Sequence, residues 1–135
     1  GYWTRWQGLP NASPSELFDI LPEGWLSDAP ITTLVLRFGA ATGVTIADPA
    51  SGTNLMWGGK RDASRPYLFV DAANRKAWTA ANADAWSGGT DATSGVDWTT
   101  EPLQVWPAID SGDYRLDIRQ TGTDKVTCRF LQSWE

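Results

Sequence analysis

The sequence predicts a mainly β protein, an antiparallel β-sandwich with one short N-terminal helix. About nine short apolar or alternating segments are separated by turn-forming residues at spacings of about eight to twelve positions, as is typical of sandwich domains. Residues 30–39 alternate between two faces, and residues 67–70 form an aromatic and branched run that is too short for a free-standing helix. Both segments therefore favour strands.

Residues 65–78 are the segment around which the other predicted strands are arranged. The apolar run 67–70 predicts a strand covered on both faces, and we expect Phe69 and at least one of Tyr67 and Leu68 to be buried. Residues 71–74 predict a turn, because Asp and Asn tolerate unusual dihedrals and bond to their own backbone. A second run that ends at Trp78 completes a hairpin. The residues expected to fix its corner are Asp71, Asn74 and Arg75.

The N-terminal part, residues 1–28, is expected to pack on the sandwich as a short strand followed by a short helix. The strand is predicted over residues 2–6. Ser13 is a suitable N-cap, Pro14 suits the first helical position, and Glu16 completes a capping box. The break at residues 22–24 limits this helix to about two turns, so it needs tertiary packing to persist.

Three strands are expected between residues 30 and 58. In the first, the even positions Leu34, Leu36 and Phe38 form the richer apolar face. Residues 44–46 predict a second strand, and residues 48–53 a strong turn. The chain then returns as a strand over residues 54–57, which ends at two glycines.

Residues 79–95 are rich in small and polar types and are interpreted as the least structured region. Trp86 stands nearly alone there, and either folds back as a plug or projects to bind a ligand. Strands are predicted over residues 103–106, 114–119 and 125–134. In the last one Cys128 is in phase with Val126 and Phe130, which favours packing in the core.

Length and composition indicate one domain, residues 1–135, which buries roughly two thirds of its unfolded surface. The chain starts at Gly1, which suggests an excised domain of a longer protein. A net charge of -5 argues against nucleic-acid and anionic-membrane partners. No apolar run approaches the length of a membrane span, and no signal peptide is evident.

Catalytic and metal chemistry finds little support in the sequence. The absence of histidine excludes a His-based triad and a His-containing zinc site. Acidic pairs such as Asp97 with Glu101, or Asp110 with Asp113, arise by chance among so many carboxylates, and residues 90–97 do not match a calcium-binding loop. We therefore expect no enzyme activity, no catalytic residue, no cofactor and no bound metal.

The surplus of tryptophan is the strongest functional signal. Nine large amphipathic rings exceed what a core of this size usually hides, so some are expected at a glycan-binding surface or a protein interface. The charge pattern does not decide between the two. The candidate aromatic residues are Trp57, Trp86, Trp98 and Trp106.

Residues 30–134 resemble the C-terminal β-sandwich of siphophage distal tail proteins, a jelly-roll or galectin-like fold that is also compared with carbohydrate-binding modules. The similar segments are a hairpin over residues 44–55, the strand, Asp corner and Arg return of residues 67–75, a late strand pair over residues 98–118, and an aromatic strand over residues 126–134. Two features depart from the family pattern: residues 107–112 replace its usual Pro-Gly turn, and residues 2–28 have no clear counterpart.

The resemblance implies a structural part of a siphovirus tail tip, in the virion, made in the host cytoplasm. The parent would be a distal or minor tail protein that forms a homo-hexameric ring between the tail tube and the baseplate or fibres, with other tail proteins as partners. The alternative is a carbohydrate-binding module that recognises a bacterial cell-wall polysaccharide, which a shared fold permits without establishing it.

Overall fold

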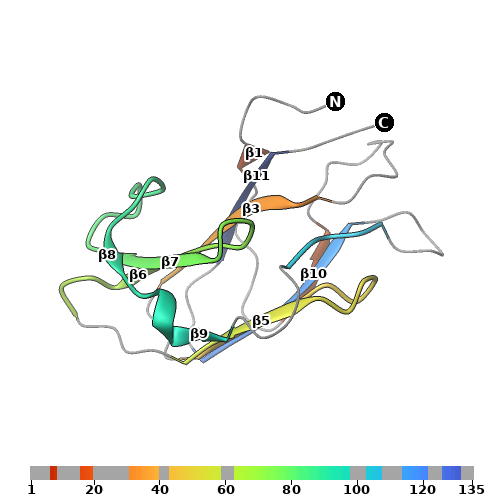
Figure 1. Ribbon diagram of the computed structural model, residues 1–135, viewed down its shortest axis with the longest axis horizontal. Coiled ribbons are helices and arrows are strands. Elements are labelled where there is room, and N and C mark those ends of the chain that lie inside the picture. The colour runs from red at the N-terminus through yellow and green to blue at the C-terminus, as the bar shows by residue number, and fades with distance from the viewer. Residues whose placement is uncertain are drawn as a thin grey trace.

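The computed structural model of the chain describes residues 7–8, 16–19, 31–39, 43–58, 63–97, 103–107, 114–121 and 126–131, with the backbone alone at 7–8, 16–19 and 130–131. Two antiparallel sheets lie face to face (Figure 1), which confirms the predicted β-sandwich. Within the described residues no helix is long and apolar enough to cross a membrane.

The first sheet has six strands. Their order across the sheet is β1 (Gln7–Gly8), β11 (Thr127–Leu131), β3 (Thr33–Phe38), β6 (Tyr67–Asp71), β7 (Lys76–Ala80) and β8 (Thr90–Asp91). The second sheet has five strands, in the order β2 (Glu16–Asp19), β10 (Arg115–Gln120), β4 (Val44–Ala47), β5 (Asn54–Trp57) and β9 (Val96–Asp97). A single 3₁₀ turn, η1 (Thr93–Gly95), leads the chain from β8 in one sheet to β9 in the other (Figure 1).

The main core fills the space between the sheets. Leu34, Leu36 and Phe38 of β3 are fully buried in it, which confirms the predicted alternation of that strand. The second sheet contributes the side chains of Val44, Ile46, Leu55, Trp57, Leu116 and Ile118. Each such side chain stabilises the fold by about 1.5–3 kcal/mol relative to an exposed position.

A second buried cluster lies on the outer face of the six-stranded sheet. It consists of Val35, Phe69, Trp78 and Ala80, with Tyr67, Ala85 and Trp86 packed against it. The strand β6 is therefore covered on both faces, as predicted: Leu68 and Val70 face the main core, and Phe69 faces the outer cluster.

The hairpin predicted over residues 65–78 is formed by β6 and β7, with Phe69 opposite Trp78, and the pairing extends to Ala80. Both carboxylate oxygens of Asp71 accept hydrogen bonds from Asn74, one from its backbone N at 3.2 Å and one from its side-chain Nδ2 at 2.9 Å. Arg75 adopts a left-handed conformation with φ of 53°. These contacts confirm that the three residues fix the corner.

The turn predicted over residues 48–53 is also confirmed, and its centre is a buried carboxylate. Asp48 is 1% exposed, and its oxygens accept hydrogen bonds from the backbone N of Ala50, Ser51 and Trp106 at 3.0–3.2 Å. Gly52 follows with φ of 78°, a conformation that favours glycine. One side chain therefore ties the β4–β5 hairpin to the segment around residue 106.

The N-terminal helix requires correction where the structure describes it. Residues 16–19 form strand β2, which pairs with β10 so that Phe18 lies opposite Leu116. Pairing with a sheet edge satisfies the backbone groups of this segment, which a two-turn helix satisfies poorly. The remainder of the predicted helix and the strand predicted over residues 2–6 lie outside the described residues.

Two further predictions are corrected in the second half of the chain. Residues 79–95 are more regular than expected, because β7 continues to Ala80 and β8 and η1 follow. The strand predicted over residues 103–106 is reduced to isolated bridges, Ile31 with Val105 and, just beyond it, Pro107 with Tyr114. The strands predicted over residues 114–119 and 125–134 correspond to β10 and β11, and Cys128 is buried, as predicted.

Candidate functional site

Three aromatic rings meet on the outer face of the six-stranded sheet. Phe69 and Trp78 stack nearly parallel, with ring centroids 5.6 Å apart and planes 5° apart. Trp86, from the loop between β7 and β8, meets Phe69 edge-on with a centroid distance of 5.2 Å. Such pairs stabilise the packed state by about 0.5–1.5 kcal/mol beyond the area they bury. Trp86 thus folds back onto the sheet while remaining partly exposed.

The loop that carries Trp86 is attached to β7 at both ends. The indole Nε1 of Trp78 donates a hydrogen bond to the carbonyl of Ala85 at 2.7 Å, and the backbone N of Ala92 donates to the carbonyl of Ala77 at 2.8 Å. Gly89 passes so close to the strand that an added Cβ would lie 2.5 Å from the carbonyl oxygen of Thr79. Glycine is required at this position because any side chain would push the loop away.

Two arginines hold Trp86 from the sheet side. The guanidinium carbon of Arg129 lies 4.5 Å from the ring centroid of Trp86, and that of Arg37 lies 5.2 Å from it. Arg37 also donates hydrogen bonds to the carbonyl of Ala83 at 2.8 Å and to Oγ1 of Thr127 at 2.9 Å. Cation–π contacts of this kind contribute about 0.5–2 kcal/mol, depending on how far they are desolvated. The position of the Trp86 ring is therefore fixed before any ligand arrives.

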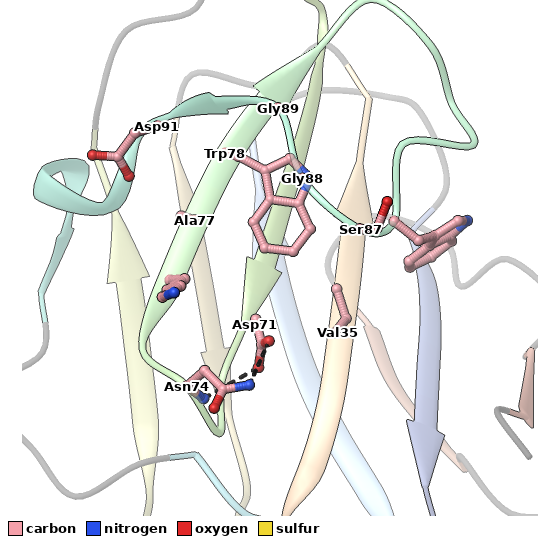
Figure 2. Close-up of a pocket in the computed structure, with 11 residues that line it drawn as sticks. Val35, Asp71, Asn74, Ala77, Trp78, Ser87, Gly88, Gly89 and Asp91 are labelled. Carbon is pink, nitrogen blue, oxygen red and sulfur yellow. Dashed lines mark hydrogen bonds between the residues drawn. The ribbon is translucent and has the colours of Figure 1, made fainter. Parts of the chain in front are cut away.

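An open groove of about 430 Å³ runs along β7 beside this cluster (Figure 2). Figure 2 shows Trp78 in the middle of it, with Asp71 and Asn74 at the hairpin end and Gly88 and Gly89 crossing at the other end. The polar or charged side chains that line the groove are those of Asp71, Asn74, Lys76, Ser87 and Asp91. The groove thus combines aromatic surface with several hydrogen-bonding groups.

Asp91 sets the charge at one side of the groove. Its Oδ1 accepts hydrogen bonds from Oγ1 of Thr93 at 2.6 Å and from the backbone N of Thr93 at 3.1 Å. These bonds to Thr93, with a smaller contribution from Lys76, lower the pKa of the Asp91 carboxyl below its ordinary value. Asp91 is therefore a carboxylate at neutral pH, and it serves as a hydrogen-bond acceptor.

A smaller pocket of about 330 Å³ adjoins the groove and shares Trp86 with it. It is lined by Val35, Trp86, Ser87 and Arg129, of which the first three also line the groove. Trp86 therefore forms a wall shared by two openings. One opening carries acidic and amide groups, and the other carries a guanidinium.

The four tryptophans nominated from the sequence occupy different places. Trp86 lines both openings. Trp57 is 2% exposed in the main core, so it is a packing residue and is not accessible to a ligand. Trp106 is 41% exposed but lies outside both openings, with its indole Nε1 donating to Oε1 of Gln104 at 3.2 Å. Trp98 lies outside the described residues.

Several lining residues were not nominated from the sequence. Trp78 was recognised as a strand end, and the hairpin pairing that places it opposite Phe69 was a signal for its role in the cluster. Asp71 and Asn74 fix the corner and also line the groove. Arg37 and Arg129 carried no local signal, because they meet Trp86 only through the sheet.

Metal binding finds no support in the described ranges, where no three His, Cys, Asp or Glu side chains are grouped so as to hold an ion. No protein-family model matches the chain, and comparisons with curated proteins and with solved structures also find no match. Similarity therefore assigns no family.

Proposed function

We propose that this domain is a non-catalytic binding module that holds a saccharide in the groove along β7. The observation that carries the proposal is the fixed, partly exposed ring of Trp86 beside a row of polar side chains in an open groove. Saccharides present apolar ring faces and many hydroxyl groups, so they suit a site with one aromatic wall and several hydrogen-bonding groups.

The polar groups of the groove suit hydroxyl recognition in particular. Asp71 and Asp91 accept hydrogen bonds, Lys76 donates, and the side chains of Asn74 and Ser87 can do both. Asp71 and Asn74 are held by their mutual hydrogen bonds, and Asp91 is held by Thr93. Binding a ligand would therefore cost little side-chain entropy, because these groups are already ordered.

Binding without hydrolysis is proposed because of the charge state of Asp91. A glycosidase needs one carboxylic acid that stays protonated so that it can donate to the leaving oxygen. Asp91 has the opposite property, since its hydrogen bonds lower its pKa. Asp91 is accordingly assigned to hydrogen bonding with sugar hydroxyls, and Asp71, which Asn74 holds in place, is assigned the same role.

The setting that we propose is the tip of a siphophage tail, with the domain at the periphery of a distal or minor tail protein. Support comes from the family resemblance, which implies an antiparallel sandwich and a hairpin with an Asp corner, features present at β6 and β7. A peripheral domain with a saccharide groove would contact the cell-wall polysaccharide of the host.

Saccharide binding is tested by titrating the chain with a panel of bacterial wall polysaccharides and recording tryptophan fluorescence and calorimetric heat. We expect a response in the wild type that is lost in Trp86→Ala and kept in Trp106→Ala, because Trp106 is exposed outside the groove. Trp86→Phe keeps a smaller aromatic ring at this position, so it distinguishes the loss of stacking from a displacement of the loop. Equal responses in the Trp86 and Trp106 variants would refute the groove as the site.

The tail-tip setting has a separate test in the gene order around the parent gene. We expect a tape-measure gene just upstream and other tail genes beside it. A parent gene among unrelated cellular genes would refute the phage setting and leave the saccharide-binding proposal intact.

A further inference from the structure

Arg129 occupies an unusual position on the outer face of the six-stranded sheet. It projects from β11, its guanidinium carbon lies 4.5 Å from the centre of the Trp86 ring, and it lines the smaller pocket together with Val35 and Ser87. The ring covers one side of the guanidinium and limits its rotation. The N–H groups of the guanidinium point outward in its own plane, where they can meet an acceptor.

Arg129 differs from Arg37, its neighbour on the same ring. Arg37 donates to Ala83 and Thr127, so its terminal nitrogens are already engaged. For Arg129, no hydrogen bond or ion pair of the guanidinium is found within the part of the chain that the structure describes, and its cation–π contact is with Trp86. A partly buried guanidinium retains a strong preference for an anionic partner.

The two openings beside Trp86 differ in charge. The groove is lined by the carboxylates of Asp71 and Asp91, whereas the described residues that line the smaller pocket are Val35, Trp86, Ser87 and Arg129. A ligand that extends from the groove into the smaller pocket would therefore meet hydrogen-bond acceptors in the first and a positive charge in the second. Ser87 lines both openings, and its hydroxyl is a hydrogen-bonding group near Arg129 that a ligand could use.

We infer that the smaller pocket recognises a negatively charged substituent of the saccharide, a carboxylate or a phosphodiester, through the guanidinium of Arg129 and the hydroxyl of Ser87. This inference rests on the proposed saccharide binding and specifies its ligand class. Both anions match the fork of N–H donors that a guanidinium presents, which a neutral sugar hydroxyl does not.

The net charge of the chain indicates which acidic saccharides suit this pocket. At -5 the protein repels dense polyanions at long range, so the local charge of one arginine suits a saccharide with isolated acidic groups. We therefore expect acidic glycans with spaced charges to bind better than highly sulfated ones.

The test compares acidic and neutral forms of the same ligand on the full 135-residue chain. Calorimetry would use an oligogalacturonide and its methyl ester, with a glycerol-phosphate oligomer as the phosphodiester arm. We expect the acid to bind about tenfold more tightly than the ester, as one charge-assisted bidentate contact would give. Arg129→Gln should abolish this preference, so that acid and ester bind with equal affinity; any weakening from the lost cation–π contact with Trp86 should affect both ligands alike.

A matched control is Arg119→Gln, which removes an arginine from the other sheet, where it pairs with Asp117 at 3.0 Å. It should keep the acid preference. Arg129→Lys retains the positive charge without the fork of N–H donors, so it should keep only part of the preference for the acid over the ester. Thermal unfolding of each variant shows whether the fold is intact.

A second measurement does not depend on a long glycan. The Nε–Hε NMR signal of Arg129 should shift on titration with D-glucuronate or glycerol phosphate, and should not shift with D-glucuronamide or glycerol. If the chain binds the acid and the ester with equal affinity and this signal does not shift, the anion inference is overturned while the saccharide proposal stands. A shift with the anions but no binding of any oligosaccharide would support the pocket and refute the saccharide proposal.

Discussion

Phe69 and Trp78 are direct cross-strand partners whose rings stack 5.6 Å apart on the outer face of a sheet. Most outer faces of sandwiches are polar because water covers them. Here the stack is covered by Trp86 and the loop that carries it, so a small second core lies outside the main one. That outer cluster positions the groove.

Phe69→Ala tests the link between this cluster and the site. Phe69 is fully buried, so the change should destabilise the domain by about 3–5 kcal/mol, through lost burial and the cavity left behind. Trp86 would also lose its edge-on partner. Urea denaturation measures the loss, and Phe69→Leu, which keeps most of the volume, should cost less than about 1.5 kcal/mol. Equal stability of the two variants would contradict this account of the cluster.

Gly89→Ala should loosen the loop from β7. The new Cβ would meet the Thr79 carbonyl oxygen at 2.5 Å, and overpacking of this kind costs about 1–3 kcal/mol. Hydrogen exchange should show faster exchange of the Ala92 amide, which is bonded to Ala77. Gly58→Ala is the control, because no atom lies within 4 Å of its added Cβ. An unchanged exchange rate in Gly89→Ala would contradict the close approach.

Asp48→Ala should unfold the β4–β5 turn and release the segment at Trp106. Three backbone N–H groups lose a charged acceptor, and each such bond contributes about 1.5–3 kcal/mol without strict additivity, so we expect a loss of about 3 kcal/mol or more. Asp48→Asn should be intermediate, since its amide group opposes one of the donors. Asp117→Asn, at a surface ion pair, should change stability by less than about 1 kcal/mol. Similar losses at both positions would argue against a special role for Asp48.

Cys128 predicts a pH dependence at the alkaline end. Burial raises the pKa of its thiol to about 12 from an ordinary value of 9.0. The folded state then keeps a proton that the unfolded state loses, so this contribution to the free energy of unfolding is complete below pH 9.0 and disappears as the pH approaches 12. Cys128→Ala should lose less stability than the wild type over that interval, measured by urea denaturation. If the free energies of unfolding of the two proteins changed in parallel with pH, the raised pKa of Cys128 would be contradicted.

The fold was largely predictable because alternation and turn chemistry act locally. Leu34, Leu36 and Phe38 alternate along β3, and the Asp71 and Asn74 corner follows from their short polar side chains. The helix predicted from Ser13 was wrong at residues 16–19 for the same reason. Its capping residues are a local signal, whereas the pairing of β2 with β10 depends on a strand far along the chain.

The candidate site was less predictable. Trp57 alternates with Leu55 along β5, so its burial followed from the strand pattern, yet the surplus of tryptophan drew it into the set of exposed candidates. Trp86 was identified, but its partners were not. Its contacts with Phe69, Arg37 and Arg129 join three strands and a loop, and no local pattern encodes such a meeting.

The length of the edge strands affects how readily neighbouring molecules can pair with the sheets. In the described part of the chain, three of the four edge strands, β1, β8 and β9, contain two residues each, and the fourth, β2, contains four. Short margins offer few backbone donors and acceptors to a neighbouring molecule. Pairing between neighbouring copies through β1, β8 or β9 is therefore disfavoured.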